Sequence, residues 1–348
     1  MNEPHFSPDA LRMVRARKLS VLLFAAVMLL SLPLVGGFFG SWHPAFDSLA
    51  HFRVHLAAVL MSAALPLVLS SFRIQALAAL ALGAGAIANV AGPYAPAGAG
   101  TARAALHADG PQRAVYRLLQ MNLRFDNSDP GSVLSLIGRE RPDVITLEEV
   151  SEIWREKLAL LDSAYPYRVV CPSSNGVGGV AILSRRPLGN GSEGNCQRDG
   201  SLAMMTVDFG GQEVGIGALH LHWPWPFGQS QQIDELATPL GSIGETALLA
   251  GDLNAVSWSA AVARVAQAGT MTLVPGIGPT WLHHSLPDAL RPAGLPIDHV
   301  FAKGGVIVHS ARTLEPAGSD HLPVLVEFSL LPMEPRHEDR TATALLRQ

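Results

Sequence analysis

The chain has 348 residues and a formal net charge of −4, so it is longer than one core usually needs and too acidic for a general nucleic-acid clamp. Only 16% of the residues are charged and the mean hydropathy is +0.24, which excludes an intrinsically disordered chain. Two cysteines exclude a disulfide-rich scaffold and a four-cysteine zinc site. Residues 1–100 hold six Lys/Arg and three Asp/Glu, whereas residues 101–348 carry a net charge of −7. The composition therefore predicts a membrane part followed by an acidic, water-exposed domain.

Three apolar runs occupy the first part of the chain. Leu19–Phe46 contains no Asp, Glu, Lys or Arg, and about 20 apolar residues suffice to cross the hydrocarbon core of a bilayer. A second run covers Val54–Ser71, and a third, rich in Ala and Gly, covers Ala76–Tyr94. A cleaved signal peptide is the alternative for the first run, and a buried helix or loose linker is the alternative for the third. We expect a cytoplasmic basic N-terminus over residues 1–18 and a three-helix membrane anchor over residues 19–94.

The basic residues set the expected orientation of this anchor. Arg73 lies between the second and third runs, whereas the loop between the first two contains only Arg53. The basic residues before the first run are Arg12, Arg15, Arg17 and Lys18. Because basic loops stay in the cytoplasm, the N-terminus is expected inside. Three crossings then place the rest of the chain on the periplasmic or extracellular side of a bacterial inner (cell) membrane.

The remainder of the chain reads as one domain between two irregular segments. Residues 95–113 are small and rich in Pro and Gly, which predicts a linker, and residues 331–348 are polar, which predicts a flexible tail. Over residues 114–330, apolar runs of strand length alternate with helical patterns and predict a single α/β or α+β domain. The expected strands are VYRLLQMN, DVITLEEV, VAILSR, AMMTVDF, VGIGALHL, TALLAGDLN, HVFAKG and HLPVLVEFSL. The expected helices are Gly131–Arg139, Ser151–Leu161, Gln229–Leu240 and Ser257–Ala268.

Polar residues gather where these expected strands end or begin. Asp252 and Asn254 follow an apolar run with an i, i+2 spacing, which places both on one face of an extended chain. If the last two strands run antiparallel to the others, all of these residues meet along one edge of a sheet. Converging carboxylates repel one another unless a cation neutralises them, and oxygen ligands without cysteine favour Mg²⁺ or Mn²⁺ over zinc. The residues are Asn122, Glu149, His220, Asp252, Asn254, Asp298–His299 and Asp320–His321.

Eight short blocks follow one another along the chain: QMN (120–122), LEEV (147–150), GGVAILSR (178–185), ALHL (218–221), GDLN (251–254), PTW (279–281), IDHVF (297–301) and SDHLPV (319–324). Taken in this order, they resemble the signature of the endonuclease/exonuclease/phosphatase superfamily. Pancreatic-deoxyribonuclease-like nucleases, abasic-site endonucleases, inositol polyphosphate phosphatases and neutral sphingomyelinases belong to it. The resemblance spans roughly residues 115–330 and none of the membrane part. The family usually has Gln before its metal-binding Glu, whereas this chain has Glu148, and the V-x-x-L-E-E-V register favours Glu149 as the ligand.

The resemblance implies a fold, a reaction and a set of roles. The implied fold is a four-layer sandwich of two mixed β-sheets flanked by helices, here preceded by about three transmembrane helices. The implied reaction is metal-assisted hydrolysis of a phosphoester. The implied metal-side residues are Asn122, Glu149 and Asp320. Among the implied catalytic residues, Asp298 and His321 form a pair in which Asp298 orients the imidazole. Asp252 and Asn254 position the attacking water and the phosphoryl oxygens. His220 contacts the phosphate. Either Asp252 or His321 takes the proton of the attacking water.

These observations predict a membrane-anchored, divalent-metal-dependent phosphoesterase. Its expected partners are the bilayer and a phosphoester substrate (nucleic acid, lipid headgroup or small phosphate ester), with no protein partner evident. A nuclease acting on extracytoplasmic DNA or RNA is an alternative, although a domain of net charge −7 repels polyanions. A membrane tether favours a substrate near the bilayer. The alternative from another class is an inactive membrane sensor or scaffold of the same fold, which we would expect to have lost some of the site residues.

Two further features stay outside the family blocks. The run WPWPF at 223–227 suits base stacking, lipid-headgroup contact or packing beneath a loop, and packing is the favoured interpretation. Cys171 and Cys196 are separated by a strand and turns of a length that can return the chain on itself, so a disulfide is expected in an oxidising compartment. Two unrelated buried thiols are the alternative.

Overall fold

The computed structural model describes residues 8–94, 113–174, 176 and 178–332. The predicted linker and tail therefore lie outside the described residues, apart from residues 113, 331 and 332. The chain divides into two compact units, which are described separately here. The first comprises Met1–Ala95 together with His222–Gln231 and Ala255–Ala263, and the second comprises the rest.

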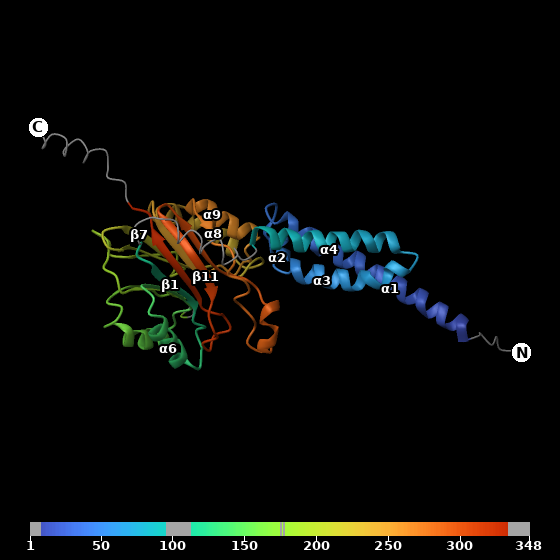
Figure 1. Ribbon diagram of the computed structural model, residues 1–348, viewed down its shortest axis with the longest axis horizontal. Helices are drawn as coiled ribbons and strands as arrows, with labels where there is room; N and C mark the ends of the chain where they lie inside the picture. Colours follow the sequence, from blue (N-terminus) through green and yellow to red (C-terminus); the bar gives the residue numbers. More distant parts are fainter. Residues whose placement is uncertain (1–7, 95–112, 175, 177, 333–348) are drawn as a thin grey trace, which may run out of the picture. The chain divides into compact units, whose positions relative to one another are not determined.

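The helices of the first unit pack through apolar side chains. α1, α3 and α4 contact one another (Figure 1), and their shared core includes Val27, Leu60 and Ala76. The helices of this part are α1 (Pro8–Gly36), η1 (Gly37–Phe39), α2 (Pro44–Ala50), α3 (Arg53–Ala64), η2 (Leu65–Leu69) and α4 (Arg73–Tyr94). Each of the three apolar runs in the sequence thus forms helix.

Two of these helices are long and apolar enough to cross a membrane, judged by length and composition. They contain the stretches Arg12–Phe39 and Arg73–Ala91. The pair Pro44–Ala50 and Arg53–Leu69 meets the same criteria together but is bent by 63°. Counted as one span, this pair gives three candidate crossings, and counted as a re-entrant segment it leaves two.

The second unit contains two six-stranded mixed sheets. Each of the eight strands expected from the sequence is present, and β3, β5, β9 and β11 come in addition. The first sheet has the order β11 (Val306–Thr313), β12 (Val324–Leu330), β1 (Tyr116–Asn122), β2 (Val144–Glu148), β4 (Val180–Ser184) and β3 (Tyr167–Cys171). The second has the order β5 (Asn195–Gln197), β6 (Leu202–Asp208), β7 (Glu213–His220), β8 (Ala247–Asp252), β10 (Asp298–Lys303) and β9 (Thr272–Leu273). Parallel pairing occurs only at β1–β2 and β7–β8 among the described strands.

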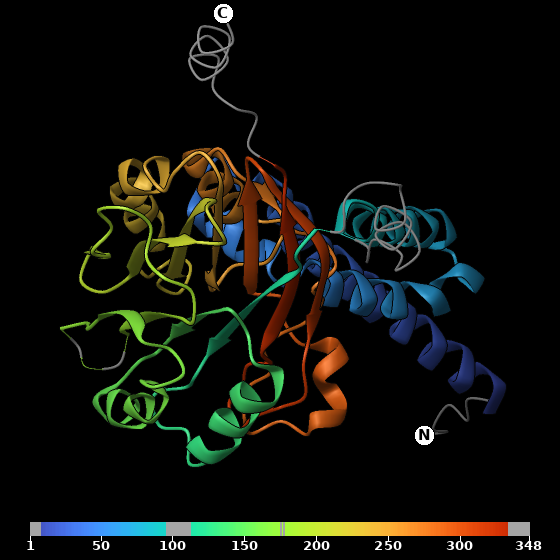
Figure 2. The ribbon, with the colours of Figure 1, turned by 60° about the vertical axis from the view of Figure 1, so that its left-hand side comes forward.

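The expected four-layer sandwich of two mixed sheets flanked by helices is confirmed (Figure 2). One apolar core fills the space between the sheets and includes Ile182, Ile216 and Phe328. A second core lies on the outer face of the first sheet, where α6 and α7 contribute Leu136 and Trp154. The helices are α6 (Pro130–Glu140), α7 (Glu152–Leu158), η3 (Ala159–Leu161), α8 (Gln229–Gly241), α9 (Ala260–Gly269) and η4 (Asp288–Ala293).

The predicted disulfide is present and joins the two sheets. Cys171 ends β3, the edge strand of the first sheet, and Cys196 lies in β5, the edge strand of the second. Their Cα atoms are 5.4 Å apart, within the range that a disulfide requires. The bond therefore closes one side of the sandwich covalently.

Candidate functional site

A row of three polar residues is set by strand pairing in the second sheet. His220 on β7 pairs with Asp252 on β8, and Asp298 on β10 pairs with Asp252 from the other side. Because β10 is antiparallel to β8, its beginning lies beside the ends of the other two strands, as the sequence argument required. The preceding residue, Gly251, permits this approach, since a Cβ atom there would lie 1.9 Å from the carbonyl oxygen of Leu219.

The first sheet contributes residues from the ends of β1 and β2. Asn122 pairs with Glu148 at these ends, and the chain then turns through Glu149, whose φ of 57° is uncommon for a residue other than glycine. The Asn122 amide Nδ2 donates to Glu149 Oε1 at 3.1 Å and to Asp252 Oδ2 at 3.0 Å. The backbone N–H of Phe125 donates to Glu149 Oε2 at 2.9 Å. Asn122 therefore links the ends of the two sheets at the site.

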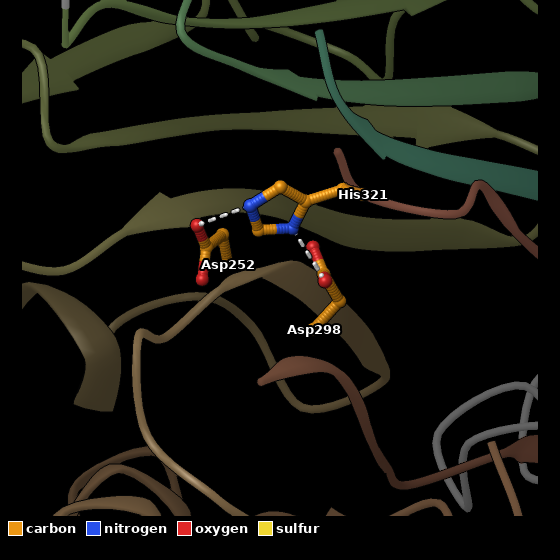
Figure 3. A group of neighbouring side chains, drawn as sticks. All are labelled: Asp252, Asp298 and His321. Carbon is orange, nitrogen blue, oxygen red and sulfur yellow. Dashed lines mark hydrogen bonds and ion pairs between the residues drawn. The ribbon is translucent and has the colours of Figure 1, made fainter. Parts of the chain in front are cut away.

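His321 lies between two carboxylates (Figure 3). Its Nδ1 is 2.8 Å from Asp298 Oδ2, and its Nε2 is 3.7 Å from Asp252 Oδ2. The ring is placed by the turn before β12, because the His321 N–H donates to Ser319 Oγ at 3.1 Å and that hydroxyl donates to the Asn122 carbonyl at 2.9 Å. His220 approaches the same Asp252 oxygen, with its Nε2 also at 3.7 Å.

Burial and the charges of neighbouring side chains shift the pKa values of His321, Asp252 and Asp298. Burial by itself lowers the pKa of His321, but the charges of Asp298 and Asp252 outweigh it and raise this pKa to about 10. Burial raises the pKa of Asp252 to about 6, against the opposing charge of His321. Burial also favours the neutral form of Asp298, yet His321 holds the pKa of this carboxyl below its ordinary value. Near neutral pH, His321 is therefore an imidazolium between two carboxylates.

A second layer of polar side chains supports Asp298 from behind. Gln120 Nε2 donates to Asp298 Oδ1 and to Glu148 Oε2, both at 2.8 Å. The backbone N–H of Asp298 donates to Thr280 Oγ1 at 3.1 Å. Sequence reasoning assigned no role to Gln120 or Thr280, although both stand in quoted blocks, QMN and PTW. Burial raises the pKa of Glu148 well above its ordinary value, which favours its neutral form beside Gln120.

Two groups of side chains offer ligands for a cation. Asp252, Asp298 and His321 place one ligand atom each within 4.8 Å of one another, which makes them a candidate metal site. In this group, however, the raised pKa of His321 favours its protonated form, which offsets part of the carboxylate charge. Glu149 and Asp252 form a second, oxygen-rich set, in which both carboxylates accept hydrogen bonds from Asn122 Nδ2. The Asn122 Oδ1 accepts from the Arg124 N–H at 2.9 Å, so this amide would have to turn to offer its oxygen to a cation. The second set fits a hard divalent ion better, because protonated imidazole offers no lone pair.

Asp320, the remaining predicted metal residue, is held by a different partner. Its Oδ2 accepts a hydrogen bond from Trp281 Nε1 at 3.0 Å. Within the described ranges, no hydrogen bond joins Asp320 to Asn122 or Glu149. Trp281 had no role assigned from sequence, although the PTW block contains it.

The expected geometry of Asn254 is wrong. β8 ends at Asp252, and Asn254 has a left-handed φ of 47° instead of an extended conformation. The reason is local, since the Asn254 N–H turns back to donate to Asp252 Oδ1 at 2.7 Å. Its side-chain Nδ2 donates to the Leu221 carbonyl at 2.9 Å. Asn254 thus braces the Asp252 carboxylate and the end of β7.

The aromatic run after His220 is not packed beneath a loop, contrary to the favoured interpretation. Trp223, Trp225 and Phe227 are 47%, 52% and 64% exposed. The segment that contains them belongs to the same compact unit as the N-terminal helices, and Ser48 Oγ donates to the Trp225 carbonyl at 3.1 Å.

Comparison with known proteins agrees with this geometry. The model of the endonuclease/exonuclease/phosphatase family matches residues 119–321. Among solved structures, the endonuclease/exonuclease/phosphatase from Bacteroides vulgatus aligns with a TM-score of 0.52 and 16% identity, over 63% of this chain and 100% of that one. D. rerio TDP2 complexed with a single-strand DNA product aligns with a TM-score of 0.51 and 17% identity, over 62% of this chain and 99% of that one. These likenesses show the fold. No curated protein sequence matches the chain.

Proposed function

Because this chain belongs to the endonuclease/exonuclease/phosphatase family, we propose that it is a membrane-anchored hydrolase of phosphoester bonds that depends on Mg²⁺ or Mn²⁺. The observation that carries the proposal is the arrangement of His321, with Asp298 at 2.8 Å on one ring nitrogen and Asp252 at 3.7 Å from the other. A buried imidazolium beside an ionised carboxylate supplies both a positive charge for a phosphoryl group and a base for water.

The protonation states divide the work between the two residues. His321, with a pKa of about 10, holds its proton at neutral pH and can donate a hydrogen bond to a phosphoryl oxygen. Asp252, with a pKa of about 6, is ionised at neutral pH and can take the proton of the attacking water. We therefore assign the base to Asp252. Asp298 orients the ring, and His220 faces the same carboxylate from β7 as a second phosphate contact.

The metal would be held by Glu149 and Asn122, with Asp320 as a further candidate. A divalent ion bound there supplies charge neutralisation to the phosphoryl oxygens and acidifies a bound water. The supporting observation is that Glu149 and Asp252 accept hydrogen bonds from the same Asn122 amide, which brings two carboxylates together at the site.

Three observations support a location in the membrane with the site outside the cytoplasm. Leu22, Leu29 and Leu32 on α1 are each 67% exposed, a stripe that is unfavourable in water and suits lipid. The basic residues before the first span favour a cytoplasmic N-terminus. The Cys171–Cys196 bridge suits an oxidising compartment.

The exposed aromatic run favours a substrate at the bilayer surface. Trp and Phe side chains settle at the level of the lipid headgroups, and Trp223 follows the proposed phosphate contact His220 by three residues. A lipid-headgroup phosphoester is therefore our first substrate class. The net charge of −7 over residues 101–348 is unfavourable for binding long nucleic acids.

The full-length protein in nanodiscs, supplied with Mg²⁺, tests the proposal. The substrates are bis-p-nitrophenyl phosphate, p-nitrophenyl phosphate, plasmid DNA and vesicles containing sphingomyelin. We expect diester hydrolysis that EDTA abolishes and that His321→Ala and Asp252→Asn each remove. His309→Ala is the matched control, because His309 contacts Ser329 on β12, away from the proposed residues. Preferred cleavage of plasmid DNA would favour the nuclease alternative, and no hydrolysis of any substrate would favour the inactive scaffold.

A further inference from the structure

The N-terminus of α9 is capped by a residue of the N-terminal helices. The backbone N–H groups of Ala260 and Ala261 donate to the two carboxylate oxygens of Asp47, at 2.7 and 2.9 Å. The next N–H, that of Val262, donates to Ser259 Oγ at 3.1 Å. The first three amides of a helix have no partner within the helix, so these contacts complete it. Asp47 is 7% exposed and also faces the positive end of the helix dipole.

In a second hydrogen bond between the same two segments, the donor lies before α9 and the acceptor lies in α2. Trp258 Nε1 donates to the carbonyl oxygen of Ala50 at 2.8 Å. Ala50 is the last residue of α2, where carbonyls lack a partner within the helix. Residues 258–261 and α2 therefore provide hydrogen-bond partners for each other: Asp47 for the first N–H groups of α9, and Trp258 for the last carbonyl of α2. Both segments belong to the first compact unit.

The chain leaves room for the Asp47 carboxylate. A Cβ atom on Gly40 would lie 2.5 Å from Asp47 Oδ1, closer than such atoms approach. Gly40 thus permits the position of this carboxylate, and a methyl group there would displace it without removing it.

The capped segment is joined directly to the candidate site. Asn254, whose N–H braces Asp252, is followed by residues 255–259 and then by α9. This connection is five residues long, so we expect a displacement of the helix start to reach Asp252. An error of about 1 Å in the position of a reacting group can cost about 10²-fold in rate.

We infer that Asp47 is a positioning residue for the candidate site, which makes the N-terminal helical part a component of catalysis as well as an anchor. The inference rests on the proposed function. It holds for a small soluble substrate as much as for a lipid, because it concerns the placement of Asp252 and not access to the bilayer.

The test compares variants of the full chain in nanodiscs on bis-p-nitrophenyl phosphate with Mg²⁺. Asp47→Ala should lower kcat about tenfold with KM changed less than about twofold, and Asp47→Asn, which keeps one acceptor, should recover part of the loss. Gly40→Ala should act in the same direction as Asp47→Ala. The matched control is Asp129→Ala, because Asp129 caps α6 through Ser132 N at 3.1 Å and α6 carries no proposed site residue.

Hydrogen exchange supplies a local readout. Peptides covering residues 255–263 should exchange faster in Asp47→Ala and unchanged in Asp129→Ala. If Asp47→Ala does not fold, Asp47→Asn and Gly40→Ala are compared with Asp129→Ala instead. Suppose that the wild type is active and the Asp47 variants keep their kcat, or lose no more kcat than Asp129→Ala at an equal loss of thermal stability. Either result overturns the inference and leaves the proposed function intact. A wild type inert on every substrate overturns the proposed function, and the inference with it.

Discussion

His321 Nδ1 lies 2.8 Å from Asp298 Oδ2, and both side chains are almost completely buried. In that setting each group fixes the charge of the other, since the negative carboxylate favours the imidazolium and the imidazolium favours the carboxylate. The pair therefore keeps its charges over a wide range of pH. Its effect should appear in the pH dependence of the rate.

The pH dependence of kcat/KM should be bell-shaped. Activity should rise through pH 6 as Asp252, whose pKa is raised to about 6, loses its proton, and fall through pH 10 as His321 loses its own. Asp298→Asn removes a negative charge that raises the pKa of His321, so the falling limb should move to lower pH. Initial rates on a soluble diester across this range provide the measurement. A falling limb that stays in place in Asp298→Asn would show that His321 is not the group responsible.

The two adjacent acids at the end of β2 should respond differently to substitution. Glu149→Gln should lower activity by orders of magnitude and raise the Mg²⁺ concentration needed, because it removes a charge from the oxygen-rich set. Glu148→Gln should do much less, since burial raises the pKa of Glu148 and so favours its neutral form, to which Gln is close in size. Magnesium titrations of both variants decide this, and the opposite ranking would move the metal to Glu148.

Much of this site could be predicted from the sequence, because strand ends bring polar residues together. The order of blocks predicted Asp252, Asp298 and His321 near one another, and all three meet in the structure. Asn254 was misplaced because the sequence does not reveal its left-handed turn. Gln120 and Thr280 were overlooked because a buried supporting hydrogen bond has no signature of its own. Contacts such as Asp47 with Ala260, 213 residues apart, depend on packing that no local pattern contains.

Loss of the disulfide should reduce stability more than turnover. The bond closes a loop with a sequence separation of 25, which contributes about 3 kcal/mol in the chain-entropy model. Cys171→Ser combined with Cys196→Ser should therefore lower the Tm while kcat stays near that of the wild type, because neither residue touches the site. Thermal unfolding with and without reductant measures this. Alkylatable Cys171 and Cys196 in native membranes would refute the bridge and weaken the case for an exported domain.

The orientation of the chain is testable with fusions. A reporter enzyme that works only in the periplasm should be active when fused after residue 110 and inactive when fused after Arg73. The reason is the excess of basic residues before the first span, which holds that end inside. A cytoplasm-specific reporter at the same positions is the control. The reverse pattern would place the site in the cytoplasm and remove the argument for an exported substrate.

The cross-strand row of His220, Asp252 and Asp298 has a consequence for how such a protein diversifies. Each residue occupies the end of its own strand, and the backbone ladders of β7, β8 and β10 set their spacing. The segment that leaves β7, residues 221–228, can change in length and composition while the ladder stays the same. Exchange of this segment would then leave the spacing of the row unchanged.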